Sequence, residues 1–369
     1  MSLSQEIKNY AEGLGINRVR ICGPEPFEEL LPLLQKRKEA GYGTPFEERD
    51  LQLRIEPRRL LPEVRSIIAV SVSYGGKAVG SRVPQELKPG ISYHAWGEDY
   101  HRALRRQLEQ LVDFLEIRVG RKVQSLICVD ATPLVERAVA RRSGLGWYGK
   151  NCSLITPDEG SWVFLGEILV DVELDRDYPL DHRGCGNCSR CLEACPAGAL
   201  RAPYTLDSSR CLSYISQKSG FIPEEFRSLL GTRLYGCDTC QLVCPYNHSP
   251  EPVSQASIAR PERFTAELVK VLSLNRQEFY QMFGFSVLAW RGKNVLARNA
   301  AVALGNLGDE DAVPGLKKAL LEHPSPTVRG HAAWALGRIG GSSAGEALVR
   351  AKKMETDSRV LKEIERALV

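Results

Sequence analysis

Residues 185–196, with the sequence CGNCSRCLEACP, contain four cysteines in the spacing C-x2-C-x2-C-x3-C, followed by a proline. In bacterial ferredoxins the first three thiolates of such a run bind one [4Fe-4S] cluster, and the fourth binds a second cluster. Residues 237–245, CDTCQLVCP, repeat the last part of this pattern and also end in Cys-Pro. The two segments together predict a ferredoxin-type domain with two [4Fe-4S] clusters.

The second segment lacks the first cysteine of the usual run, and Cys211 is the candidate that replaces it. Crossed ligation then predicts a first ligand set of Cys185, Cys188, Cys191 and Cys244, and a second set of Cys195, Cys211, Cys237 and Cys240. Two zinc sites are the alternative, because C-x2-C pairs also suit tetrahedral zinc. Zinc, however, explains neither the triple spacing nor the two Cys-Pro endings. The other cysteines, Cys22, Cys128 and Cys152, lie in apolar segments, where we expect small core side chains.

The first part of the chain, residues 1–175, alternates apolar runs with helical stretches. SIIAVSVSY (66–74) and SWVFLGEILV (161–170) are runs of this kind. In DYHRALRRQLEQLVDFLE (99–116), four leucines recur at helical spacing: Leu104, Leu108, Leu111 and Leu115. The pattern predicts an α/β domain with a buried sheet.

The rest of the chain divides into two further parts. Residues 176–250 hold the cysteine runs and form the predicted two-cluster domain. Residues 255–369 are rich in alanine and leucine, and ARNAAVALGNLG (297–308) recurs as RGHAAWALGRIG (329–340). Such a repeat predicts stacked, HEAT-like pairs of helices. The predicted fold class is therefore a multidomain protein with an α/β part, a ferredoxin-like part and an α-helical repeat part.

The composition limits the possible functions. The chain has 369 residues and a formal net charge of only +4, so we expect no DNA partner. No stretch approaches the roughly eighteen apolar residues of a membrane span, and the first residues, MSLSQEIKNYAEGLG, do not follow the pattern of a secretory signal. We therefore expect a cytoplasmic, monomeric protein without a membrane partner. In a reducing compartment its eleven cysteines serve metal or redox chemistry rather than disulfides.

Asp130 is the candidate catalytic residue. It follows an apolar strand in VDATPLVERAVARRSGLGWYGKN (129–151), where Thr132 and Pro133 resemble the start of a helix. Ligands of open α/β sheets collect beyond strand ends, so an acid at this turn is expected at the mouth of a pocket. An ordinary surface aspartate is the alternative on position alone.

The order of an α/β region, a ferredoxin-like insert and a HEAT-like tail resembles the epoxyqueuosine reductase family over nearly the whole chain. The resemblance is carried by VDATPLVERAVARRSGLGWYGKN, CGNCSRCLEACPAGAL, RCLSYISQKSGFIPEEFR, RLYGCDTCQLVCPYN and WRGKNVLARNA. It implies an N-terminal cobalamin-binding domain, two [4Fe-4S] clusters, and reduction of epoxyqueuosine to queuosine at the wobble position of a tRNA anticodon loop. It also implies that Asp130 matches the family's proton donor and that Arg54 matches an arginine of its cobalamin site.

Further contacts are expected around these centres. The residues expected at the cofactors are Arg54, Asp130, Arg141, Lys150, Asn151, Ser213, Gln217 and Asp238. The residues expected at phosphates of the tRNA anticodon stem-loop are Lys218, Arg291, Lys293, Arg298 and Arg329. An unidentified electron donor is expected to reduce the clusters. His101, in DYHRAL, lacks the following glycine of a D-x-H-x-x-G cobalt-ligating motif, so we expect cobalamin without histidine ligation.

Two other functions would use some of the same features. A cobalamin-dependent reductive dehalogenase would share the cofactors, but those enzymes usually carry a twin-arginine signal and no HEAT-like tail. A non-catalytic iron-sulfur electron-transfer or scaffold protein would use the repeats to bind a partner. A visible spectrum would separate this last case, because cobalamin bands beside iron-sulfur absorption favour an enzyme.

Overall fold

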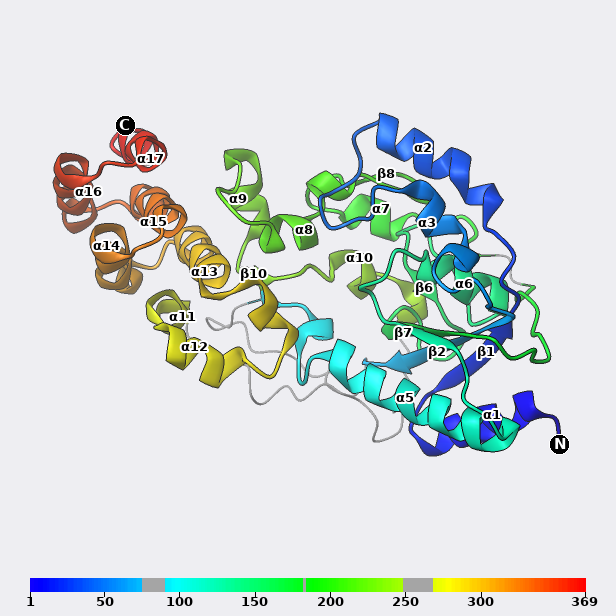
Figure 1. Ribbon diagram of the computed structural model, residues 1–369. Helices are drawn as coiled ribbons and strands as arrows, with labels where there is room; N and C mark the ends of the chain where they lie inside the picture. The colour runs from blue at the N-terminus through cyan, green and yellow to red at the C-terminus, as the bar shows by residue number, and fades with distance from the viewer. Residues whose placement is uncertain (75–89, 182–183, 248–267) are drawn as a thin grey trace. The chain divides into compact units, whose positions relative to one another are not determined.

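The computed structural model describes residues 1–74, 90–181, 184–247 and 268–369 (Figure 1). The chain forms two compact units, each assembled from three stretches of sequence. Unit 1 comprises Met1–Ser81, Glu98–Ser209 and Thr239–Arg260, and unit 2 comprises Arg82–Gly97, Arg210–Asp238 and Pro261–Val369. Each unit combines stretches that are far apart in the chain, so the bounds of the units differ from those of the three consecutive domains expected from the sequence. Those three domains stay a prediction.

Unit 1 is built on a four-stranded sheet in the order β1-β2-β7-β4. The strands are β1 (Arg18–Cys22), β2 (Ser66–Ser73), β7 (Val163–Val170) and β4 (Ser125–Cys128). Every neighbouring pair is antiparallel. The predicted buried sheet is therefore present. The expectation that Asp130 lies at a pocket, however, was based on the strand ends of open, mostly parallel α/β sheets, and this sheet is antiparallel. Asp130 follows the edge strand β4, whose neighbour β7 runs in the opposite direction.

Helices cover both faces of this sheet, which explains why all eight residues of β2 are buried. On one face lies α5 (Tyr100–Val119), whose predicted leucine stripe is buried as expected. Gly166 of β7 faces this helix, and a side chain there would meet Leu104 and Leu108 at 3.0 and 3.1 Å. On the other face, α6 (Glu136–Ser143) packs into a core that includes Cys22 and Cys128. These two cysteines are core residues, as predicted, whereas Cys152 is half-buried.

The remaining elements of unit 1 are short, apart from α1 and α2. They are α1 (Leu3–Gly13), η1 (Glu28–Leu30), α2 (Leu31–Glu39), α3 (Leu51–Ile55), η2 (Pro57–Arg59), β5 (Trp147–Tyr148), β6 (Leu154–Ile155), α7 (Arg190–Ala194), β8 (Leu200–Ala202), β9 (Thr205–Leu206), α10 (Thr239–Leu242) and η5 (Pro245–Asn247). Helices α7 and α10 carry parts of the two cysteine runs and pack against each other. The fold thus brings together two segments that are about fifty residues apart in the sequence.

Unit 2 is mostly helical, with β3 (Gly90–Ile91) pairing in parallel with β10 (Arg233–Tyr235). Its helices are η3 (Tyr93–Ala95), α8 (Leu212–Gln217), α9 (Glu224–Leu230), α11 (Leu268–Ser273), α12 (Arg276–Phe283), η7 (Val287–Arg291), α13 (Lys293–Leu307), η8 (Glu310–Ala312), α14 (Val313–Glu322), α15 (Pro326–Ile339), α16 (Ser342–Met354) and α17 (Ser358–Ala367). The short η4 (Ser208–Arg210) lies where the chain passes between the units.

The helices from α13 onward stack in succession (Figure 1), as the sequence repeat predicts. The two similar segments are α13 and α15, and α17 packs on α15 as α15 packs on α13. Glycines at equivalent positions permit this close packing. A side chain at Gly305 would lie 2.8 Å from the backbone of Ala335, and one at Gly337 would lie 2.7 Å from the side chain of Ala367. The HEAT-like prediction is confirmed for these helices.

Candidate active site and iron-sulfur site

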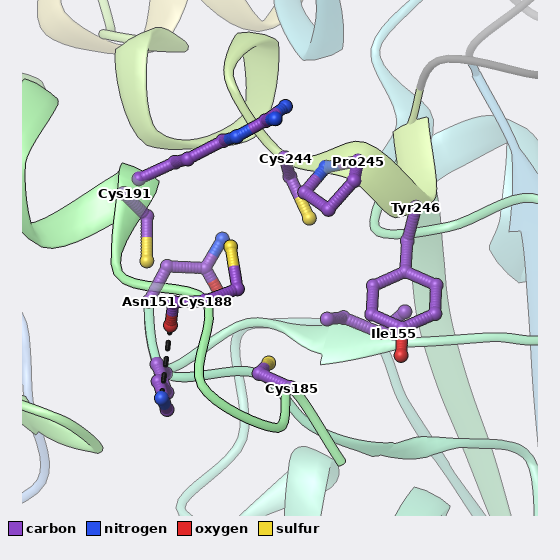
Figure 2. Close-up of a pocket in the computed structure, with 10 residues that line it drawn as sticks. Asn151, Ile155, Cys185, Cys188, Cys191, Cys244, Pro245 and Tyr246 are labelled. Atoms are coloured by element: carbon purple, nitrogen blue, oxygen red, sulfur yellow. Dashed lines mark hydrogen bonds between the residues drawn. The ribbon is translucent and has the colours of Figure 1, made fainter.

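The four cysteines of the first predicted ligand set line one cavity of unit 1, with a volume of about 290 Å³. Figure 2 shows the sulfur atoms of Cys185, Cys188, Cys191 and Cys244 directed into the same space. The cavity is also lined by Lys150, Asn151, Ile155, Arg190, Pro245 and Tyr246. Four thiolates around a common space are the donor set that a [4Fe-4S] cluster requires. The residues present therefore fit such a cluster.

Hydrogen bonds fix the loops that carry these thiols. The backbone N–H of Cys188 donates to the carbonyl of Cys185 at 3.1 Å, and the Tyr246 hydroxyl donates to the carbonyl of Gly184 at 2.9 Å. Burial raises the pKa of the Cys244 thiol. Iron must displace that proton when it binds, so cluster loading releases protons and orders the site.

Lys150 and Asn151 belong to this cavity. The Lys150 ammonium donates to the carbonyls of Gly186 and Cys188 at 2.7 and 2.9 Å, so it braces the first cysteine run. The side chain of Asn151 is buried, and its amide nitrogen has no hydrogen-bond partner within the described ranges. Both residues were expected at a cofactor, and the structure places them beside the four cysteines.

The second predicted ligand set is divided between the two units. Cys195 and Cys240 lie in unit 1, and Cys211 and Cys237 lie in unit 2, so this set stays a prediction from the sequence. In the parts of the chain that the structure describes, no three His, Cys, Asp or Glu side chains are placed to hold a single metal ion.

Asp130 lies in a strained turn immediately beyond β4. Its φ is +51°, and the N–H of Ala131 donates to the carbonyl of Val129 at 2.6 Å. A three-residue turn with a positive φ is uncommon, and it is costly for a residue with a side chain. The side chain of Asp130 is 62% exposed, so its carboxyl group is accessible from solvent.

Two residues at the start of α5 contact this carboxyl group. The Tyr100 hydroxyl donates to Oδ2 of Asp130 at 2.6 Å, and Nε2 of His101 lies 3.8 Å from the same oxygen. The other ring nitrogen of His101 is 2.8 Å from Asp99, the residue that caps α5. Burial alone would lower the pKa of His101, but the carboxylates of Asp130 and Asp99 raise it to about 9. A cationic imidazole therefore lies beside Asp130 at neutral pH.

Comparison with known proteins identifies the family of this chain. A relative from Bacillus cereus, named epoxyqueuosine reductase, is 40% identical over 370 residues, covering 99% of this chain and 97% of the relative. The chain belongs to the epoxyqueuosine reductase family. Three family models match parts of it: "Epoxyqueuosine reductase QueG, DUF1730" at residues 54–131, "4Fe-4S double cluster binding domain" at 184–247, and "HEAT repeats" at 291–369. The double-cluster model spans all eight predicted cysteine ligands.

Solved structures of epoxyqueuosine reductases share the fold. One contains an epoxyqueuosine-modified tRNA-Tyr stem loop, is 36% identical and has a TM-score of 0.93, with 99% of this chain and 98% of that chain covered. Another, from Bacillus subtilis, has its catalytic aspartate loop swung out of the active site, with the same identity, TM-score and coverage. Membership of an oxidoreductase family excludes the non-catalytic alternative, and the double-cluster model favours iron-sulfur clusters over zinc.

None of the helices in the described ranges is long and apolar enough to cross a membrane.

Arg54 and Arg141 are held by other parts of unit 1. The side chain of Arg54 is largely buried and lies 3.5 Å from Glu47, and its carbonyl accepts the N–H of Val135 at 3.2 Å. Arg54 thereby contacts the segment that follows Asp130. The guanidinium of Arg141 lies over the ring of Tyr148, 5.6 Å from its centroid.

Three expected cofactor residues lie in unit 2. Asp238 is buried and accepts hydrogen bonds from the Ser92 hydroxyl and, at 2.9 Å, from the backbone N–H of Tyr93. The Gln217 amide donates to the Ser213 hydroxyl at 3.2 Å within α8. Asp238 therefore orders the turn at Ser92 and Tyr93, while Ser213 and Gln217 contact each other.

The structure corrects one of the expected tRNA contacts. Arg298 is 1% exposed and donates to the carbonyls of Lys218 and Gly220, both at 2.7 Å, and to that of Ser216 at 3.1 Å. A guanidinium in this position holds the loop after α8 and has no exposed face for a phosphate. The helix that carries it, α13, is buried at this position.

The other expected tRNA contacts are partly engaged by neighbours. Arg329 forms a bidentate pair with Glu355 at 2.7 and 2.9 Å, and Nε of Arg291 donates to the carbonyl of Gln217 at 2.6 Å. Lys218 and Lys293 lie at the ends of α8 and α13 and are half-buried. These contacts stay predictions.

Sequence reasoning missed three residues around Asp130. Tyr100 and Glu136 contact it directly, and Glu167 of β7 pairs with Cys128, the last residue of the strand that precedes Asp130. One signal was available. Glu167 is the single charged residue of the apolar run SWVFLGEILV, and a lone acid in a strand buried on both faces points to a functional site.

Proposed function

We propose that this protein reduces epoxyqueuosine to queuosine in the anticodon loop of tRNA, with two [4Fe-4S] clusters, cobalamin and Asp130 as the proton donor. The observation that carries the proposal is the accessible carboxyl group of Asp130, held in a strained turn by Tyr100 and His101. A relative with the same fold binds an epoxyqueuosine-modified stem loop, and another has a catalytic aspartate on a loop. The first fact supports a tRNA substrate, and the second supports the assignment of Asp130.

The chemistry explains why these groups occur together. Converting an epoxide to an alkene consumes two electrons and two protons and releases one water molecule. The clusters, reduced by a separate electron donor, supply the electrons. The epoxide oxygen must be protonated as its carbon bond breaks, and a carboxylic acid within reach can do this.

Cobalamin, when bound, would supply a reduced metal centre able to attack the epoxide. Arg54, through its contact with the segment after Asp130, is the residue that we propose to bind it. Unit 1 also has a cavity of about 180 Å³, which could receive only a small part of so large a cofactor. It is lined by Tyr74, Arg137, Ser153, Leu154, Ser161, Val163, Leu165 and Gln241.

The protein's residues would act on the proton and on the clusters. Tyr100 donates to Oδ2 of Asp130 and thereby orients the carboxyl group, which would give its acidic proton to the epoxide oxygen. The cationic imidazole of His101 would stabilise the carboxylate left after transfer. Near the cysteines, the buried amide of Asn151 is a donor suited to a cluster sulfur, and such bonds tune the reduction potential.

We propose that unit 2 contributes to tRNA binding through Lys218, Arg291 and Lys293. Trp290 is half-exposed, and the guanidinium of Arg291 lies 4.5 Å from its ring centroid. An aromatic ring backed by a cation is suited to stack on an unpaired base of an RNA loop. Neutralising phosphates at the same surface would make binding weaken with salt.

The test is anaerobic incubation of the protein with cobalamin, a low-potential reductant and tRNA that carries epoxyqueuosine, followed by mass analysis of the nucleosides. The expected result is a nucleoside lighter by one oxygen atom, formed only when both cobalamin and reductant are present. Unchanged epoxyqueuosine with protein that contains both clusters and cobalamin would refute the proposal. Tight tRNA binding without turnover would show that the protein binds the tRNA but does not reduce epoxyqueuosine.

A further inference from the structure

Three of the four thiols in the cysteine cavity of unit 1 belong to one short run, and the fourth comes from a distant segment. Cys185, Cys188 and Cys191 lie within seven residues, whereas Cys244 follows more than fifty residues later. The run by itself does not fix where the Cys244 thiol lies. Because a [4Fe-4S] cluster needs all four thiolates at once, the fold must hold the distant segment against the cavity.

Asn247 holds the end of that segment. It lies in η5, three residues after Cys244, and is only 5% exposed. Its backbone N–H donates to the carbonyl of Cys244 at 3.0 Å, and its amide nitrogen donates to the carbonyl of Gln241 at 2.8 Å. The N–H of Cys244 donates to the same Gln241 carbonyl at 3.1 Å. Asn247 therefore closes the turn that carries the Cys244 thiol.

The amide of Asn247 also binds the loop that precedes β7. Its oxygen accepts the N–H of Ser161 at 2.8 Å, and its nitrogen donates to the Ser161 hydroxyl at 2.9 Å. Gln241 adds to this contact, because its side-chain amide donates to the Ser161 carbonyl at 2.9 Å. Ser161 is buried as well. The Asn247 side chain is thus used both as a donor and as an acceptor, which no carboxylate can match.

The loop at Ser161 is shaped to receive Asn247. Gly160, directly before Ser161, has a φ of +60°. A side chain there would meet the amide oxygen of Asn247 and, at 2.6 Å, the carbonyl of Tyr246. Glycine alone combines this backbone with so close an approach. Thr156 fixes the turn, since its N–H and its hydroxyl both donate to the Gly160 carbonyl, at 2.8 and 3.1 Å.

We propose that Asn247 is a positioning residue for the cluster of the first ligand set (the first cluster): bound to Ser161, it holds Cys244 where the fourth thiolate is required. The inference rests on the proposed function and deepens it, because it names what keeps one of the two clusters complete. Replacing a residue that orients a metal ligand typically lowers metal affinity by about 10–100-fold. If Cys244 is not held, one iron loses its protein ligand for part of the time and becomes the iron most easily removed.

Asn247→Asp tests this most sharply, because it keeps the shape and the acceptor for the Ser161 N–H but loses both donated hydrogen bonds. In anaerobic protein treated with ferricyanide and a ferrous-iron chelator, the variant should release one iron atom about 10–100-fold faster than the wild type. Spin resonance of the oxidised protein should then show a [3Fe-4S] signal. Ser161→Ala removes one acceptor and should show a smaller effect of the same kind. It provides the measurement if Asn247→Asp is isolated without the first cluster.

Asn306→Asp in unit 2 is the matched control. The Asn306 amide also donates to two carbonyls, those of Arg227 and Gly231, at 2.8 and 2.9 Å. Both aspartate variants should lose stability in denaturant, since each gives up two buried hydrogen bonds. Only Asn247→Asp should release iron faster than the wild type.

Two outcomes would overturn the inference. If Asn247→Asp and Ser161→Ala release iron at the wild-type rate, the amide serves the fold alone. If Asn247→Asp and Asn306→Asp release iron equally fast, the effect follows from general destabilisation. Neither measurement uses tRNA, cobalamin or turnover. Absence of epoxyqueuosine reduction would therefore refute the proposed function without changing the result for Asn247.

Discussion

Buried charged groups are treated differently in the two units. In unit 2, Arg227 and Glu363 form two hydrogen bonds of 2.6 Å, and Arg298 is surrounded by carbonyl oxygens. In unit 1, Glu167 is fully buried, and neither of its carboxyl oxygens has a hydrogen-bond partner in the described ranges. A paired buried charge serves the fold, whereas uncompensated acids are costly for stability and are kept where a proton has to move.

His331 extends the contrast to a neutral group. This fully buried histidine accepts the N–H of Ile222 at 3.1 Å, and its other ring nitrogen lies 2.6 Å from the carbonyl of Thr327. Burial and the nearby charge of Arg227 hold its pKa well below the usual range. Both nitrogens are used in hydrogen bonds, so the group does not titrate near neutral pH and acts as a structural link.

The largest expected effect concerns the cysteine cavity of unit 1. Cys244→Ala should remove one cluster and about half of the iron, because each cluster needs four thiolates. Iron analysis and spin resonance of the reduced protein measure this loss. Cys22→Ala, which changes a core thiol outside both ligand sets, should keep all of the iron. Full iron content in Cys244→Ala would show that Cys244 is not a ligand.

The next effect tests the paired charges of unit 2. Glu363→Ala leaves Arg227 buried and unpaired, and we expect a loss of about 3–5 kcal/mol in the free energy of unfolding. Replacing both residues with leucine should recover much of that loss. Glu365→Ala, which removes an exposed partner of Lys352, should cost less than about 1 kcal/mol in denaturant unfolding. Equal losses in the two single variants would remove the contrast between buried and exposed pairs.

A smaller effect tests the unpaired acids. The pKa of Glu136 in the fold, about 8, lies above the ordinary value near 4.5, so the stabilisation from its neutral form is complete below about pH 4.5. That stabilisation is lost as the pH rises through about 8. Between pH 6 and 8.5 the wild-type protein should therefore lose more stability than Glu136→Gln, by about 2–3 kcal/mol. Parallel stability curves for the two proteins would show that Glu136 is already ionised at pH 6.

The smallest expected effect concerns tRNA binding by unit 2. Lys293→Gln should weaken binding of the anticodon stem-loop modestly and lower the dependence of the logarithm of affinity on that of salt concentration by about one unit. Lys362→Gln, on α17, is the control for net charge. If both variants bind as the wild type does at every salt concentration, the phosphate contact at Lys293 is wrong.

The features predicted well from the sequence are those encoded by local spacing. Cysteine runs, the leucine stripe of α5 and the repeated alanine-rich helices each follow from residues close together in the chain. The direction of a strand relative to its neighbour does not follow from local spacing. Strands β2 and β7 pair across about ninety residues, and their sequences are compatible with either a parallel or an antiparallel pair. Arg298 was misplaced for a related reason. A helix position shows its exposure only when all of its neighbours are known, and here the loop after α8 covers it.

The central claim is that Asp130 delivers the proton that the reaction needs. The direct measurement is single-turnover conversion of epoxyqueuosine in tRNA by Asp130→Asn, using protein already shown to contain two clusters and cobalamin. Asparagine keeps the shape and can still accept from the Tyr100 hydroxyl, but it cannot give an acidic proton. The expected result is normal tRNA binding with a rate about a hundredfold to ten-thousandfold below that of the wild type. Conversion at nearly the wild-type rate would contradict the claim.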